Sequence, residues 1–81
     1  MGQHFPTATY RDAARVAKKL GFVFLRMAKG DHEIWGKPLG GRYTTIPNWG
    51  GKNLKRKTLK GIIEDFEITP EEFLKLRHGK N

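Results

Sequence analysis

The first strong pattern in the chain is a helical spacing of apolar residues between residues 9 and 20. The apolar side chains recur every three or four residues, which places them on one face of a helix. They are Tyr10, Ala13, Ala14, Ala17 and Leu20. Thr9 and Asp12 can cap the start of this helix, and Gly21 can end it. We therefore predict a helix of modest length over residues 9–20.

Three short segments then have the composition of β-strands. Residues 22–27 are rich in β-branched and aromatic side chains, while residues 32–37 and 42–46 are each bounded by glycine or proline. Residues 38–41, Pro-Leu-Gly-Gly, supply a fixed φ and then positive φ, which predicts a hairpin between the second and third strands. Short turns between consecutive strands predict an antiparallel sheet. We expect the side chain of Met27 to lie in the core.

Two further helices are predicted after the third strand. Residues 48–52 are glycine-rich and loop-like, and apolar residues at helical spacing then mark a second helix that starts near Arg56, with Leu54 packed at its entrance. The apolar positions are Leu59, Ile62, Ile63 and Phe66. Residues 69–72, Thr-Pro-Glu-Glu, combine an N-cap threonine, a first-turn proline and a reciprocal glutamate, which predicts a short third helix through Leu76.

The predicted order is therefore helix, three antiparallel strands, helix and short helix. The economical arrangement packs the helices on one face of the sheet, which is a two-layer α+β sandwich. No repeat, linker or second domain is evident, so we expect residues 1–81 to form a single domain with its core at about 9–77. His4 and His78 fall in the termini, which we expect to be frayed.

Composition adds a strong positive charge to this picture. The chain has 16 Lys and Arg against 8 Asp and Glu, a net charge of +8, which attracts polyanions such as RNA, DNA, an anionic membrane or an acidic protein. The longest apolar run, residues 22–25, is far shorter than the roughly 20 residues of a bilayer span, and we expect no signal peptide. There is no cysteine, which excludes thiolate chemistry and fits a reducing compartment. We expect a soluble, cytoplasmic protein.

The most informative single residue is His32, which follows the basic turn Lys29-Gly30-Asp31. Metal-independent RNA cleavage needs a base for the 2′-hydroxyl, an acid for the departing 5′-oxygen, and cations to stabilise the charge on phosphorus. His32 can serve as base or acid, and Lys29 can stabilise the charge. However, a histidine near a strand end is often only structural, and alternation places His32 on the same sheet face as Ile34, which can be the buried one.

A run of cations between residues 52 and 60 is the second candidate feature. Five cations lie there without an acidic residue: Lys52, Lys55, Arg56, Lys57 and Lys60. They surround the first turn of the predicted second helix, where peptide N–H groups also point at anions, so the run predicts a phosphate clamp for RNA. A solvated helix face would explain the same run, and the acidic surface of a protein partner would suit it equally well.

Other residue types add little chemistry. Trp35 and Trp49 can stack on bases, although tryptophans in a small domain more often lie in the core or face a partner. The remaining histidines and scattered acids have no spacing that suggests a metal site, and we expect no cofactor.

Several short motifs resemble those of one family. They are Gly21-Phe22, Arg26, Lys29-Gly30-Asp31-His32, Ile46-Pro47, the run from Lys57 to Ile63, and the run from Ile68 to Phe73. In this order and spacing, from about Tyr10 to Leu76, the chain resembles the HicA (YcfA-like) mRNA interferase toxins, and the combination is far more specific than any one motif. The resemblance implies a fold like a double-stranded-RNA-binding domain, an endoribonuclease activity on mRNA, and neutralisation by a HicB-type antitoxin. By motif, the catalytic histidine of the family corresponds to His32, with Gly30 and Asp31 in its supporting turn.

The chain departs from the family pattern at two positions. Asp31 stands where serine is usual, and its carboxylate favours the protonated imidazole and repels a phosphate. Trp49 occupies the place where many members carry another histidine. Two alternatives therefore stay open: a non-catalytic double-stranded-RNA-binding module, and an inactive family member that only titrates its antitoxin. The toxin interpretation also predicts a partner interface that covers His32 and the cations of residues 52–60.

Overall fold

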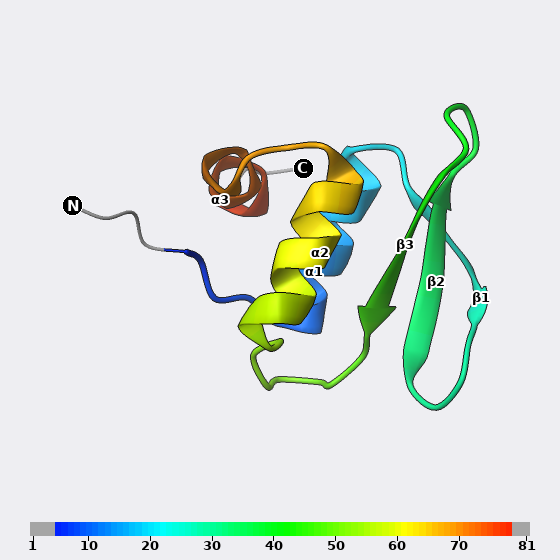
Figure 1. Cartoon of the computed structure of the whole chain (residues 1–81), viewed down its shortest axis with the longest axis horizontal. Helices are drawn as coiled ribbons and strands as arrows, with labels where there is room; N and C mark the ends of the chain where they lie inside the picture. Colours follow the sequence, from blue (N-terminus) through cyan, green and yellow to red (C-terminus); the bar gives the residue numbers. More distant parts are fainter. Residues whose placement is uncertain (1–4, 79–81) are drawn as a thin grey trace.

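The computed structural model describes residues 5–78, which form three helices and three strands (Figure 1). The elements are α1 (Tyr10–Lys19), β1 (Val23–Met27), β2 (His32–Lys37), β3 (Arg42–Pro47), α2 (Arg56–Phe66) and α3 (Pro70–His78). This confirms the predicted α+β class and element order. His4 lies outside the described residues, whereas His78 is the last residue of α3 rather than part of a frayed end.

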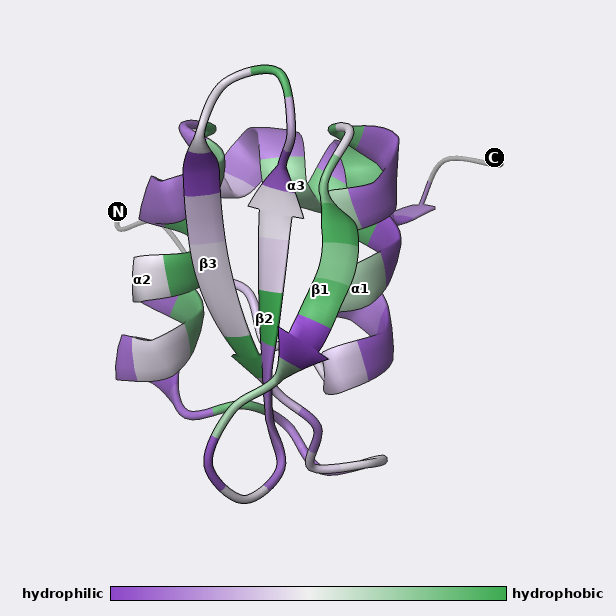
Figure 2. Ribbon diagram, turned by 90° about the vertical axis from the view of Figure 1, so that its right-hand side faces the viewer, coloured by the Kyte–Doolittle hydropathy of each residue, from purple (hydrophilic) through white to green (hydrophobic). Residues whose placement is uncertain are grey.

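The helices lie on one face of the sheet, as predicted. In Figure 1, α1 and α2 stand against the sheet, and α3 packs behind them, in contact with α1. Figure 2 looks onto the opposite face, which no helix covers. No described helix has the length and apolar character needed to cross a membrane.

The sheet has the order β1-β2-β3, with antiparallel pairing throughout. Trp35, in the middle of β2, pairs with Phe24 and with Thr44, and both Trp35 and Thr44 are buried. Side chains alternate along a strand, so His32 and Ile34 point to the uncovered face. Sequence alone left open whether this face is buried, and the structure shows that it is the open one.

The core is built where the helices meet the sheet. Its largest fully buried side chains are Phe73, Ile46, Leu59 and Val16. Met27 does not belong to this core, because its side chain is 49% exposed, so that prediction is wrong. The physical reason is that β1 is an edge strand and that the helices make their main contacts with the sheet on β3, whereas no helix contacts β1 extensively.

Capping boxes begin α1 and α3, as predicted, whereas α2 begins at Arg56, as predicted, without a side-chain cap. Thr9 and Asp12 form a reciprocal capping box at α1, and Thr69 and Glu72 form the same arrangement at α3. Lys55 is the N-cap of α2, where its side chain makes no capping hydrogen bond.

Candidate active site

His32 begins β2 directly after a tight turn that is fastened by backbone hydrogen bonds. The amide of His32 donates to Lys29 O at 3.3 Å, and the amide of Ala28 donates to His32 O at 2.6 Å. Gly30 in this turn has a φ of +65°, and a Cβ there would meet no atom within 4 Å, so the turn needs glycine for its backbone conformation and not for space. Both backbone polar groups of His32, its amide and its carbonyl, are thus hydrogen-bonded within this turn.

The imidazole of His32 is accessible to a large substrate. Its side chain is 47% exposed, and its Nδ1 lies 3.5 Å from Oδ1 of Asp31, whose side chain is 54% exposed. Asp31, which departs from the usual sequence pattern, therefore lies directly beside the candidate catalytic imidazole. Lys29, in the same turn, is exposed to solvent.

The next residue in the strand, Glu33, points the other way and joins three elements. Its Oε1 accepts hydrogen bonds from Tyr10 Oη at 2.8 Å and from Trp35 Nε1 at 3.0 Å, and its Oε2 accepts one from Asn48 Nδ2 at 3.4 Å. The side chain is buried, being 7% exposed, and such a carboxylate needs several donors to compensate for lost hydration. Glu33 thereby ties α1 and the loop after β3 to the strand that carries His32.

The environment of Glu33 perturbs its partner on α1. Burial, the hydrogen bond to Glu33 and the charge of Glu33 raise the pKa of Tyr10 from 10.0 to about 12. Tyr10 consequently remains a hydrogen-bond donor throughout the neutral range.

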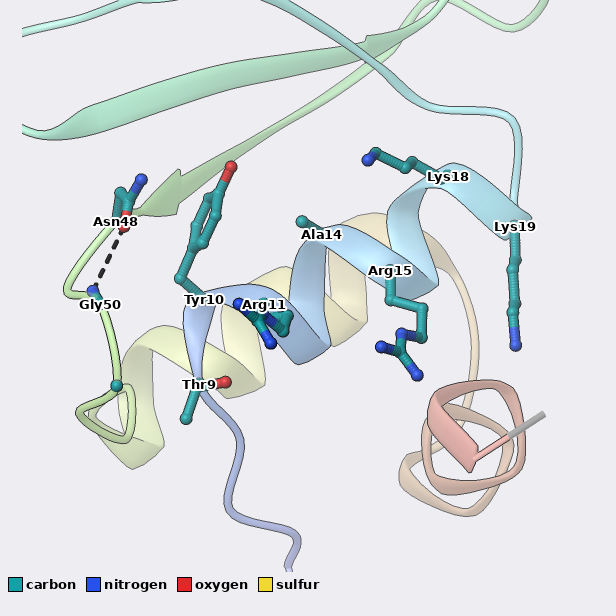
Figure 3. A pocket seen from close by; sticks show the side chains of 10 residues that line it. Thr9, Tyr10, Arg11, Ala14, Arg15, Lys18, Lys19, Asn48 and Gly50 are labelled. Atoms are coloured by element: carbon teal, nitrogen blue, oxygen red, sulfur yellow. Dashed lines mark hydrogen bonds between the residues drawn. The ribbon is translucent and has the colours of Figure 1, made fainter. Parts of the chain in front are cut away.

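The loop after β3 is fastened to the turn of His32. The amide of Asn48 donates to Asp31 O at 2.9 Å, and Asn48 Oδ1 accepts from the amide of Gly50 at 3.2 Å. Figure 3 shows the second of these bonds at the start of the loop. Figure 1 shows the turn, this loop and the first turn of α2 at one end of the molecule.

The five cations of residues 52–60 are all exposed on the loop and the first two turns of α2. Two of them lie on aromatic rings: Lys55 Nζ is 5.9 Å from the Trp49 ring centroid, and Arg56 Cζ is 5.0 Å from that of Phe5. Trp49 is half-buried beneath Lys55, whereas Trp35 lies in the core. The structure therefore leaves Trp49, and not Trp35, within reach of a ligand.

A groove links one of these cations to the open face of the sheet. It runs between the free edge of β3 and α2, and Lys57 lines it together with Ile34 and Thr45. Ile34 is two residues from His32 and shares its face. Lys57 is therefore the member of the cation run that the structure joins to the candidate active face.

A second basic surface was missed by the sequence reasoning. Exposed Arg11, Arg15 and Lys18 follow one face of α1 and line a groove whose opposite side contains Asn48 and Gly50 (Figure 3). Their spacing of four and three residues is the signal that could have identified this surface. Within residues 5–78, no group of three or more His, Asp or Glu side chains is placed to hold a metal ion.

Comparison with known proteins agrees with this arrangement. The family model described as HicA toxin of bacterial toxin-antitoxin matches residues 10–68, which extend from α1 to just after α2. No curated protein matches the chain. The match covers most of the chain and includes the turn of His32, the loop after β3 and the cations of α2, so this protein belongs to the HicA toxin family of bacterial toxin–antitoxin systems.

Proposed function

We propose that this toxin is a metal-independent endoribonuclease that cleaves mRNA in the cytoplasm. The observation that carries the proposal is the placement of His32, whose imidazole is exposed at the open face of the sheet while the turn beneath it is tied to β1 and to the loop after β3. RNA can reach this imidazole from solvent, and the cations of residues 52–60 lie at the same end of the molecule (Figure 1).

In this mechanism, His32 transfers a proton at the reacting phosphate. As a base it takes the proton of the 2′-hydroxyl, whose oxygen then bonds to phosphorus while the bond to the 5′-oxygen breaks and that oxygen takes up a proton from water. Lys29 stabilises the negative charge that gathers on the phosphate oxygens. Lys52, Lys55, Arg56, Lys57 and Lys60 hold neighbouring phosphates, as phosphate contacts position a nucleic acid without specifying its sequence. DNA lacks the 2′-hydroxyl and should resist cleavage.

The partner in this proposal is a HicB-type antitoxin. Membership of a toxin–antitoxin family implies an antitoxin partner. An acidic antitoxin would suit the net charge of +8 and would stop cleavage by covering His32 and the cations of residues 52–60. This part of the proposal fails if the antitoxin binds tightly while RNA cleavage continues undiminished.

A second candidate function is that of an inactive family member, and Asp31 favours it. Its carboxylate lies 3.5 Å from the imidazole of His32 and repels the phosphate that must approach there. The serine that is usual in the family would not repel it. Replacing Asp31 therefore separates the two candidates.

The test compares cleavage of a defined RNA, with a chelator present, by wild type, His32→Ala and Asp31→Ser. We expect wild type to cut, His32→Ala to bind RNA with unchanged affinity but to cleave about 10²–10⁴-fold more slowly, and Asp31→Ser to cut at least as fast as wild type. Circular dichroism checks that the folds are equal. His78→Ala is the matched control, because His78 is an exposed histidine at the far end of α3.

The outcomes separate the candidates. If His32→Ala cleaves at the wild-type rate, the role of His32 is refuted. If wild type and His32→Ala both bind RNA and only Asp31→Ser cuts, the chain is an inactive member. If none of the variants cuts although all bind, a double-stranded-RNA-binding module becomes the better description.

A further inference from the structure

The exposed apolar side chains of this protein are concentrated on one part of the sheet. Among the described residues, the large apolar side chains with high exposure are Val23, Phe24, Leu25, Met27, Tyr43 and Leu39. Val23, Leu25 and Tyr43 lie on the open face, and we call these three residues the β1 patch. Phe24 and Met27 pair with the buried residues Trp35 and Glu33 and therefore belong to the other side of this edge strand. Figure 2 shows β1 as a mostly hydrophobic ribbon at the edge of the open face. An edge strand of this composition is a hazard for a free protein unless a partner covers it.

The patch is continuous across the three strands. A Cβ built on Gly36 in β2 would lie 2.6 Å from Leu25 Cδ1 and 3.1 Å from two ring atoms of Tyr43. Leu25 on β1 and Tyr43 on β3 therefore close over the backbone of Gly36 from both sides. The absence of a side chain at Gly36 allows an unbroken apolar surface here.

The patch lies on the same face as His32 but at a distance from it. His32 and Gly36 are four residues apart in β2, which corresponds to about 13 Å along the strand. A protein seated on the patch is thus close enough to cover the imidazole, although the patch itself has no proton-transfer group beyond the phenol of Tyr43. Contacts here can change binding without changing the chemistry at His32.

The composition of the patch identifies the class of partner. Its aliphatic side chains cannot hold phosphates, so RNA is a poor occupant. A second copy is also a poor occupant, because each chain carries a charge of +8, Arg26 lies within β1, and the β-bulge between Phe24 and Arg26 interrupts the strand edge. Exposed Arg26 and Lys29 lie between the apolar centre and the turn of His32, which fits a protein surface with an apolar centre and an acidic rim.

We propose that the β1 patch is the docking surface for the antitoxin and that it supplies most of the affinity of the complex. This inference extends the proposed function, since it places the main binding contacts beside the catalytic group instead of on it. Leu25 and Tyr43 are the expected anchors, because large side chains at the centre of an interface carry most of its binding energy.

The test measures binding of the purified toxin to its cognate antitoxin by calorimetry, without RNA. Leu25→Ser with Tyr43→Ser should lower the affinity at least about 30-fold. RNA cleavage without antitoxin should stay at the wild-type rate in Leu25→Ser, because Leu25 is not among the residues that line the groove with Tyr43 and Lys57. Either single substitution gives the measurement if the pair lowers stability. Leu39→Ser is the matched control, because Leu39 is a 96% exposed apolar residue at the tip of the β2–β3 hairpin.

Several outcomes would overturn the proposal. Unchanged antitoxin affinity in the double variant, an equal loss with Leu39→Ser, or no binding by wild type would each do so. A wild-type dimer that the double variant abolishes would identify a second copy as the occupant. If the variants lose antitoxin binding and wild type also fails to cut RNA, the docking proposal is supported and the proposed ribonuclease function is refuted.

Discussion

His32 and Glu33 are neighbours in the chain with opposite environments. Alternation along β2 turns the imidazole to solvent and the carboxylate of Glu33 into the protein, where Tyr10, Trp35 and Asn48 donate to it. A buried carboxylate with three donors keeps one geometry, since every alternative leaves a polar group unpaired. At this scale, the rigidity of the candidate site depends on a residue that never meets the substrate.

Tyr10→Phe tests this hydrogen-bond network through its pH dependence. The substitution removes one hydrogen bond to a carboxylate and should lower the free energy of unfolding by about 1–2 kcal/mol near neutral pH. The pKa of Tyr10 is about 12 in the folded protein and 10.0 ordinarily. The stabilising contribution is therefore complete below pH 10 and is lost as the pH rises from 10 to 12. Urea unfolding measures the free energy of unfolding of both proteins at several pH values. The difference between the two proteins cancels every contribution that they share.

Tyr43→Phe is the control for this experiment, because Tyr43 is an exposed tyrosine on β3. We expect its effect on the free energy of unfolding to be within about 0.5 kcal/mol. A stability difference between wild type and Tyr10→Phe that stays constant from pH 8 to pH 12 would contradict the raised pKa of Tyr10.

Among the elements, α2 is the one whose start opposes ordinary helix chemistry. α1 and α3 begin with capping boxes, whereas Lys55 occupies the N-cap of α2 and no acidic residue stands in its first turn. Cations at a helix N-terminus oppose the helix dipole. Such a local conflict is expected where a site serves binding rather than stability, and in the proposed function a helix N-terminus and Lys55 would together face a phosphate of RNA.

Lys55→Asp should raise stability and weaken RNA binding together. An aspartate at the N-cap accepts a backbone hydrogen bond and matches the helix dipole, which contributes about 1 kcal/mol and raises the melting temperature by about 4–8 °C in a domain of this size. The lost contact with Trp49, at 5.9 Å and exposed, offsets little of this gain. Calorimetry and RNA binding measure the two effects.

Lys52→Asp is the matched control, because it makes the same change of charge in the exposed loop before α2, away from the N-cap. It should weaken RNA binding without raising the melting temperature. If both variants are stabilised equally, relief of charge repulsion and not capping is the cause.

On the scale of the whole molecule, the positive charge is divided between surfaces that we expect to contribute differently to RNA binding. The cations of residues 52–60 share an end of the molecule with the turn of His32, and the groove beside β3 joins Lys57 to the face of His32. The helix α3 lies on the other side of the molecule, behind α1 and α2. Equal charges should therefore contribute unequally to RNA binding.

Lys57→Gln should flatten the salt dependence of RNA binding, whereas Lys75→Gln, an exposed lysine on α3, should leave it unchanged. Each lost phosphate contact with single-stranded RNA reduces the slope of log K against log salt concentration by about 0.7. Both changes are made in a His32→Ala background, so that the RNA remains intact. Equal slopes for the two variants would show that general charge, rather than the groove beside β3, determines binding.

The sequence by itself determined the elements and their ends. Apolar spacing marked the helices, Gly21 and the boxes at Thr9 and Thr69 marked boundaries, and Pro38 with its following glycines marked the hairpin. These features depend on contacts within a few residues of each other, which is why periodicity and turn chemistry suffice. The combination of short motifs likewise indicated the family, and this resemblance indicated the candidate catalytic residue, before any fold was known.

Only the tertiary structure decided which face of the sheet is open, and several assignments depend on that. His32 and Met27 are exposed, Glu33 is buried under Tyr10, Lys57 shares a groove with Ile34, and Leu25 meets Tyr43 over Gly36. These relations join residues distant in the chain. The physical reason is that burial depends on where α1 and α2 come to rest against the sheet, and strand alternation specifies two faces without saying which of them the helices cover.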